Sequence, residues 1–176
     1  MWLVGGILLV PMHISRRAAS FVLIASVLPL HLHAQLQADR LIIHKKARTM
    51  ELMHASQVLK SYKVALGGDP VGPKTRQGDH RTPEGVYIID SRNAQSKFHR
   101  SLHVSYPNAK DKERARKLGA SPGGDIFIHG LPNGYGFVGA AHRAKDWTDG
   151  CIAVTDQEIE EIWRLVDNGT PVEIRP

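Results

Sequence analysis

The sequence predicts a mostly β domain of the α+β class, with helices on its flank. Six or seven strand-like segments and two helical ones are expected between residues 39 and 176. Hydrophobic residues make up 42% of the 176-residue chain and charged residues 23%, which is enough apolar material for a packed core. This length suits one domain with a short appendage, and we place the domain at residues 39–176.

The first part of the predicted domain consists of strands and one long loop. Residues 39–67 alternate loosely between apolar and polar side chains, which predicts a hairpin and a third strand that ends at a Gly-Gly pair. Residues 69–85 are rich in Gly, Pro and charged side chains, and a loop of this length in a compact domain is usually functional. Two further strands are expected at residues 84–90 and 102–107.

The second part of the predicted domain contributes both helices. Residues 109–118 carry charges at helical density and end at Gly119, a natural C-cap. Residues 125–130 form an apolar strand that ends in His-Gly, and a Gly-rich segment follows over residues 131–150.

The C-terminal helix has a clear start signal. Thr155 and Glu158 form a capping box that opens a helix, and Asn168 with Gly169 ends it before a closing strand at residues 171–176. The predicted apolar face of this helix holds Ile159, Ile162, Trp163 and Val166.

Residues 1–34 have the composition of an N-terminal leader. An apolar run of 11 residues at 18–28 follows Arg16 and Arg17, and Ala34 supplies a small residue near the end. The run is short for a membrane span, so a cleaved signal peptide is the first interpretation and an uncleaved anchor the alternative. Export to the periplasm or cell envelope follows from either one.

Two features refine this leader. Residues 1–11 form a second apolar patch upstream of the arginines, and Met12 would make a conventional start, so we interpret residues 1–11 as an artefact of start-site choice. No cysteine lies near the expected cleavage site, which argues against a lipoprotein anchor.

The charge of the predicted domain is mildly basic. The whole chain has a formal net charge of +6, of which Arg16 and Arg17 of the leader contribute two. A surplus of this size suits an anionic polymer or membrane surface. No dense Lys/Arg block is present, so nucleic-acid binding is not expected.

The chain contains a single cysteine, Cys151, which excludes a disulfide framework and a cysteine-rich zinc site. In an oxidising compartment an unpaired thiol is easier to explain by chemistry than by packing. The preceding Gly150 lets the backbone bend and bring an amide N–H to a substrate carbonyl. Since Ile152 and Val154 look buried, alternation is expected to turn Cys151 and Ala153 to the opposite side.

A nucleophilic thiol needs a base, and histidine is the expected one. His129 closes the apolar strand and precedes Gly130, at a strand end suited to presenting a side chain in a cleft. His142 is nearer to Cys151 in sequence and is the rival base. Structural roles are expected for His44, His54 and His103, and loop positions within reach of a substrate for His80 and His99.

Two motifs resemble the L,D-transpeptidase (YkuD-type) family. Residues 128–130 (IHG), followed after a gap by residues 148–151 (TDGC), are similar to that family's upstream His and later [S/T]-H-G-C. Residues 81–87 (RTPEGVY) resemble its T-P-x-G-x-[YF] strand, and the likeness covers residues 39–176.

The resemblance implies an L,D-transpeptidase-like β-sandwich or barrel with one C-terminal helix, acting on peptidoglycan stem peptides. Cys151 would form a thioester acyl-enzyme that an acceptor amine resolves into a 3→3 cross-link. His129 would be the base, oriented by the Gly130 carbonyl, and the amides of Gly150 and Cys151 would donate to the oxyanion.

The resemblance also implies ligands and alternatives. Carbapenem-type inhibitors would acylate the same thiol, a cell-wall-attached protein is a further partner, no cofactor or metal is expected, and we expect a monomer. An L,D-carboxypeptidase or protein–peptidoglycan amidase of the same fold is the alternative enzyme. A non-catalytic peptidoglycan-binding module is the alternative outside catalysis.

Asp149 departs from the family pattern, because it stands where a second His is usual. An ionised carboxylate cannot donate a hydrogen bond, so it would orient His129, bind an acceptor ammonium, or raise the pKa of the thiol by repulsion. A carboxylate that caps the loop is the structural alternative. The other substrate-binding candidates are Thr148, Arg143, Lys145, Trp147, His142 and Tyr106.

Overall fold

The computed structural model describes residues 36–176, so the predicted leader at 1–34 lies outside the described residues. None of the helices in the described part is long and apolar enough to cross a membrane. The strands are β1 (Arg40–His44), β2 (Thr49–His54), β3 (Gln57–Lys63), β4 (Gly85–Ser96), β5 (His99–Val104), β6 (Phe127–His129), β7 (Ile152–Ala153) and β8 (Pro171–Arg175). The helices are α1 (Ala109–Lys117), α2 (Asp156–Leu165) and the 3₁₀ helix η1 (Gly136–Ala144).

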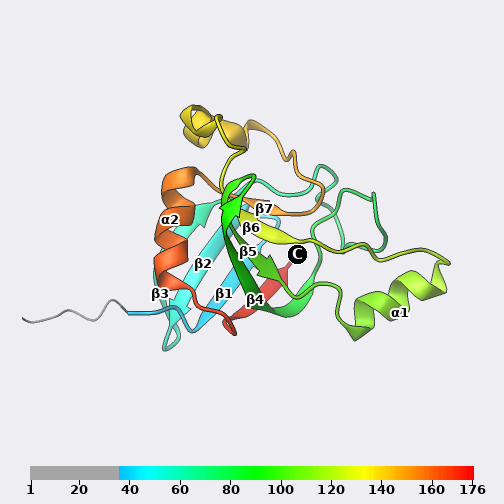
Figure 1. Ribbon diagram of the computed structural model, residues 1–176. Coiled ribbons are helices and arrows are strands. Elements are labelled where there is room, and N and C mark those ends of the chain that lie inside the picture. Colours follow the sequence, from blue (N-terminus) through cyan, green and yellow to red (C-terminus); the bar gives the residue numbers. More distant parts are fainter. Residues whose placement is uncertain (1–35) are drawn as a thin grey trace, which may run out of the picture. The chain divides into compact units, whose positions relative to one another are not determined.

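The eight strands form one curled sheet in the order β3-β2-β1-β8-β4-β5-β6-β7 (Figure 1). Strand β4 is long and belongs to both halves, because its first part pairs with β8 and the part from Ile89 onward pairs with β5. The curl brings the last strand, β7, to the chain that leaves β3. There Ala65 and Ala153 exchange two backbone hydrogen bonds of 2.9 and 2.8 Å. The predicted fold class is therefore confirmed, with a sheet that closes on itself like a barrel.

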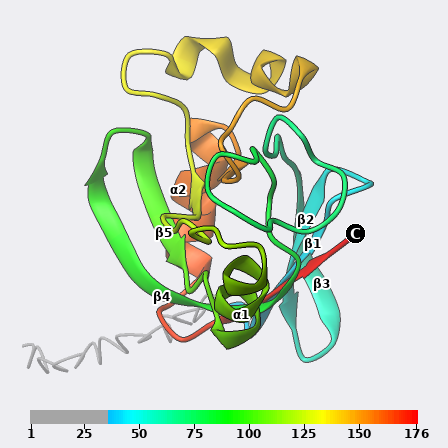
Figure 2. The ribbon, with the colours of Figure 1, turned by 90° about the vertical axis from the view of Figure 1, so that its right-hand side faces the viewer.

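The core lies inside this curl and against α2. Residues Leu41, Leu52, Leu102 and Ile128 of four different strands are fully buried there. Helix α2 packs on β5 and β6. Figure 2 shows it next to β5.

Helix α2 follows its sequence signals closely. The Thr155 side chain accepts from the Glu158 amide and the Glu158 carboxylate accepts from the Thr155 amide, as predicted for a capping box. Ile159 and Ile162 are fully buried, as expected. Trp163 is only partly buried, and the Arg92 guanidinium stacks on its ring, with the guanidinium carbon 4.0 Å from the ring centroid.

Three expectations about the strands need correction. Strand β4 runs on to Ser96 and β5 begins at His99, so a polar hairpin extends beyond the apolar pattern that predicted its base. His99 therefore lies in a strand rather than a loop, and its Nε2 is 2.8 Å from the Glu160 carboxylate. Ala153 is fully buried rather than turned outward, and the short β7 strand that carries it lies between β6 and the chain at Ala65.

The capping box of α2 should contribute measurably to the free energy of unfolding of the domain. Replacing Thr155 by Ala removes the side-chain oxygen that receives the Glu158 amide, and should lower the free energy of unfolding by about 1 kcal/mol in urea denaturation. Gln157→Ala, at an exposed position of the same helix, should leave it nearly unchanged. Equal effects of the two substitutions would show that the cap contributes nothing.

Candidate active site

A cavity of about 830 Å³ lies where β6, the segment at 147–151 that leads into β7, the β4–β5 hairpin and the loop at 69–85 meet. Cys151 and His129 both line it. Other lining residues include Lys74, His80, Asn93, Gln95, Phe98, Asp125, Phe127, Trp147, Thr148 and Asp149. The predicted nucleophile and the predicted base therefore line the same cavity.

The register of two parallel strands puts His129 and Cys151 on the same side of the sheet. His129 pairs with Ala153, and Cys151 stands two residues before Ala153. Side chains two residues apart along a strand share a face, so the thiol and the imidazole are diagonal neighbours. The alternation of the strand, rather than any sequence proximity, brings them together.

A tight turn presents the cysteine. Thr148 Oγ1 donates to the Cys151 carbonyl at 2.8 Å and accepts from the Gly150 amide at 3.1 Å. Gly150 has φ near +125°, and a Cβ there would lie 2.5 Å from the Arg81 carbonyl oxygen, so only glycine fits. Since the Gly150 amide already donates to Thr148 Oγ1, the geometry favours the Cys151 amide as the oxyanion donor of the predicted two.

The His129 imidazole is fixed in one tautomer. Its Nδ1 lies 2.7 Å from the Gly130 carbonyl oxygen, which can only accept, so Nδ1 carries the hydrogen and Nε2 keeps its lone pair. Burial against the rings of Phe98 and Trp147, whose centroids are 4.5 and 5.8 Å away, lowers the pKa of His129 to about 4. The ring is therefore a neutral base at pH 7.

The Cys151 thiol is protonated at rest. Burial raises the pKa of Cys151, the carboxylates of Asp149 and Asp125 raise it further, and a hydrogen bond from the Phe127 amide opposes them. The Sγ atom lies 3.5 Å from the Asp125 carbonyl oxygen, which accepts from the thiol. A neutral thiol beside a neutral imidazole is the arrangement for general-base activation rather than for a preformed ion pair.

The rival base, His142, occupies a different place. Its Nδ1 accepts from the Trp147 indole N–H at 3.3 Å, and its ring lines a separate apolar hollow of about 380 Å³ on the other side of Trp147. It does not line the cavity of Cys151. The geometry therefore favours His129 as the base and gives His142 the task of holding Trp147.

Two predicted substrate-binding residues lie outside the cavity. Arg143 forms an ion pair with Glu158 at the start of α2, so its charge is already engaged. Tyr106 is buried, donates its hydroxyl to the Pro122 carbonyl at 2.8 Å and packs edge-on against Tyr87. Both side chains are therefore placed away from Cys151, because each has a structural partner that local sequence does not reveal. Lys145 also lies outside the cavity.

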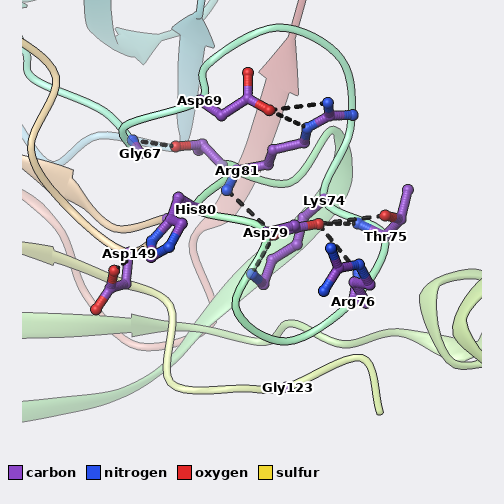
Figure 3. A network of polar contacts seen from close by, with 12 residues as sticks. Gly67, Asp69, Lys74, Thr75, Arg76, Asp79, His80, Arg81, Gly123 and Asp149 are labelled. Atoms are coloured by element: carbon purple, nitrogen blue, oxygen red, sulfur yellow. Dashed lines mark hydrogen bonds and ion pairs between the residues drawn. The ribbon is translucent and has the colours of Figure 1, made fainter. Parts of the chain in front are cut away.

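The loop at 69–85 contributes residues that sequence reasoning did not assign. The buried Asp79 carboxylate accepts from Lys74 Nζ at 2.8 Å and from three backbone amides, those of Thr75, Arg76 and Arg81 (Figure 3). Burial alone would raise the pKa of Asp79, but these donors hold it well below its usual range.

The length and polarity of the loop at 69–85 were the available sequence signal for its functional role. The polar hairpin that carries Asn93 and Gln95 has no comparable sequence signal for a place at the cavity.

Asp149 does not contact His129. Its Oδ1 lies 2.7 Å from His80 Nδ1 (Figure 3). Both side chains line the cavity and are exposed, so they form its rim. Of the roles weighed for Asp149, orientation of His129 is excluded, because the Gly130 carbonyl performs it. Its charge does raise the pKa of Cys151.

Comparison with known protein families identifies the family of the domain that carries this site. The family model described as the L,D-transpeptidase catalytic domain (YkuD) matches residues 38–174. This chain belongs to that family. The predicted resemblance is thereby confirmed over almost the whole domain.

Individual relatives agree with this assignment. "Putative L,D-transpeptidase YafK" of Escherichia coli (strain K12) is 30% identical over 130 residues, which are 70% of this chain and 45% of the relative. This chain thus spans less than half the length of that protein. Pgp2 of Campylobacter jejuni, a helical cell shape determining protein, shares the fold with a TM-score of 0.58 and 21% identity over 78% of this chain and 47% of Pgp2. Bd1075 of Bdellovibrio bacteriovorus has a TM-score of 0.55, with 22% identity over 80% of this chain and 48% of that protein.

The described part of this L,D-transpeptidase domain offers no metal site. Within residues 36–176, no group of three or more His, Cys, Asp or Glu side chains is arranged to hold an ion.

The low pKa of His129 predicts how the acylation of Cys151 in this L,D-transpeptidase domain depends on pH. A general base must be unprotonated, so the rate of Cys151 acylation should be retained at neutral pH and fall as the pH drops through about 4. The measurement is the pH dependence of carbapenem acylation, followed by mass spectrometry. Trp147→Ala admits water beside His129 and should move the acid limb upward, toward the ~6.5 of an exposed histidine. A wild-type limb near 6.5 would contradict the neutral buried base.

Proposed function

We propose that this domain is an exported L,D-transpeptidase that acts on peptidoglycan stem peptides through a thioester on Cys151. The observation that carries the proposal is the shared cavity of Cys151 and His129, in which the imidazole is neutral and its Nε2 free. Membership of the L,D-transpeptidase family supports the reaction class.

The first half-reaction follows from these positions. As Sγ attacks the carbonyl carbon of the donor peptide, Nε2 of His129 takes the thiol proton and the oxyanion forms near the Cys151 amide. When the tetrahedral intermediate collapses, the C–N bond breaks and the imidazolium returns that proton to the leaving amine. The products are the thioester and a free amine, and His129 is neutral again.

The second half-reaction uses the same atoms in reverse. An acceptor amine of a neighbouring stem attacks the thioester carbon, the C–S bond breaks, and Cys151 leaves as a thiol protonated through His129. The new amide is the 3→3 cross-link. An amine on a cell-wall-attached protein would react in the same way.

Location and charge fit this role. The leader predicted at residues 1–34 would carry the domain into the cell envelope, where peptidoglycan lies. The surplus of basic residues in the remaining chain favours an anionic polymer. Pgp2 is named as a cell shape determining protein, and altered cross-linking by this domain would likewise change cell shape.

Thiol labelling tests the nucleophile. A carbapenem should add its mass once to the purified wild type and not to Cys151→Ala, because the thioester forms on that sulfur. Intact-protein mass spectrometry reads this directly. An unmodified wild type would contradict the proposed chemistry and favour a non-catalytic binding module.

Two histidine variants test the base. His129→Ala should slow acylation by about 10²-fold or more, while His142→Ala, which loosens only Trp147, should cost far less. Both are measured as acylation rate at saturating carbapenem. If His142→Ala is the more damaging change, the base is misassigned.

Muropeptide analysis tests the outcome of the reaction. Cells that produce the protein should gain 3→3 linked dimers relative to cells that produce Cys151→Ala. Shortened stems or released protein without new dimers would indicate a hydrolase of the same fold.

A further inference from the structure

The rim of the cavity carries a second histidine, which the reaction described above leaves unused. His80 and Asp149 come from segments 69 residues apart, and their side chains meet at 2.7 Å between Nδ1 and Oδ1. They are 59% and 89% exposed, so a ligand entering the cavity can reach both. Asp149 stands two residues before Cys151, which places the pair beside the reacting sulfur.

The backbone holds His80 in this place. Its carbonyl accepts from the Asp69 amide at 3.0 Å and lies so close to Gly67 that a Cβ there would be 2.2 Å from the oxygen. The next residue, Arg81, donates its amide to Asp79, whose carboxylate is tied to the buried Lys74 (Figure 3). The loop therefore fixes the backbone of His80, and Asp149 holds its imidazole.

The tautomer of His80 is set by its partner. An ionised carboxylate only accepts, so His80 Nδ1 donates to Asp149 and Nε2 keeps a lone pair. Asp149 supplies a negative charge at the same point. An imidazole that accepts a proton beside a carboxylate that attracts a cation is suited to a protonated amine.

The proton balance of the second half-reaction requires such a group. A primary amine arrives as an ammonium ion and must lose two protons to become an amide nitrogen. One of these ends on the sulfur of Cys151, carried by His129, and the other needs a different acceptor. Water as the acceptor loses only the proton that goes to the sulfur, so hydrolysis needs no second base.

We propose that the His80–Asp149 pair binds the ammonium group of the acceptor and removes its first proton. Asp149 attracts the ammonium, His80 Nε2 takes one proton, and the neutral amine attacks the thioester. His129 then takes the second proton and delivers it to Cys151, and His80 releases the first to solvent. This inference rests on the proposed function and assigns its acceptor subsite.

The test compares the two fates of one acyl-enzyme. Purified protein is given a tetrapeptide-stem donor and an amine-bearing stem acceptor, and the ratio of cross-linked to hydrolysed product is measured by mass spectrometry. In His80→Gln and Asp149→Asn this ratio should fall by about tenfold or more. The ratio is independent of acylation, so the effect of Asp149 on the pKa of Cys151 does not enter.

Two controls separate this role from a structural one. His44→Gln removes a histidine that pairs with Glu51 between β1 and β2, outside the cavity, and should leave the ratio at the wild-type value. Hydroxylamine is largely unprotonated at neutral pH and needs no first base. With hydroxylamine as acceptor, His80→Gln and Asp149→Asn should partition like the wild type.

The outcomes are distinct. An unchanged ratio with the ammonium acceptor, or an equal fall with hydroxylamine, would overturn the assignment of the pair. A wild type that hydrolyses the donor and never transfers it would also overturn it while leaving thioester chemistry intact. A wild type that does not consume the donor at all would overturn the proposed function itself.

Discussion

The closure of the sheet at β7 is the constraint on which the site depends. Strand β7 has only two residues, and it is held on one side by β6 and on the other by the two backbone hydrogen bonds between Ala65 and Ala153. Its register against β6 puts Cys151 on the same side as His129. A slip of one residue would turn the thiol away from the cavity, so the pairing determines the chemistry.

Burial then sets the protonation of both reacting groups in opposite directions. The apolar surroundings lower the pKa of His129 and raise the pKa of Cys151, so the resting pair is uncharged. At the exposed rim of the cavity, the Asp149 carboxylate and the His80 imidazole face the solvent. The interior is suited to moving a proton between neutral groups, and the rim to receiving a charged substrate.

Much of the fold and the centre of the site could be predicted from local sequence. The capping box of Thr155 and Glu158 involves neighbours, and the strand end at His129 places its ring within reach of the next carbonyl. What local sequence could not predict are contacts with distant partners. Arg143 is engaged by Glu158 and Tyr106 by the Pro122 carbonyl, and neither contact has a sequence signature.

The same limit explains what was missed at the rim and in the hairpin. His80 and Asp149 meet only because the loop at 69–85 folds over the end of β7, and nothing in either segment points to the other. The hairpin that extends β4 and β5 is polar on both sides, so its pattern lacks the alternation that marks a half-buried strand. The burial of Ala153 could not be predicted either, since β7 pairs with β6 and with Ala65, which are distant in the chain.

The proposed chemistry depends on a neutral His129, with its hydrogen on Nδ1 and a lone pair on Nε2, in the cavity that it shares with Cys151. Nitrogen-15 NMR of the imidazole in selectively labelled protein at pH 7 tests this most directly, without any assay of activity. The account predicts a protonated Nδ1 and an unprotonated Nε2 for the ring that is lost from the spectrum in His129→Gln. A spectrum with the hydrogen on Nε2, or with both nitrogens protonated, would contradict it.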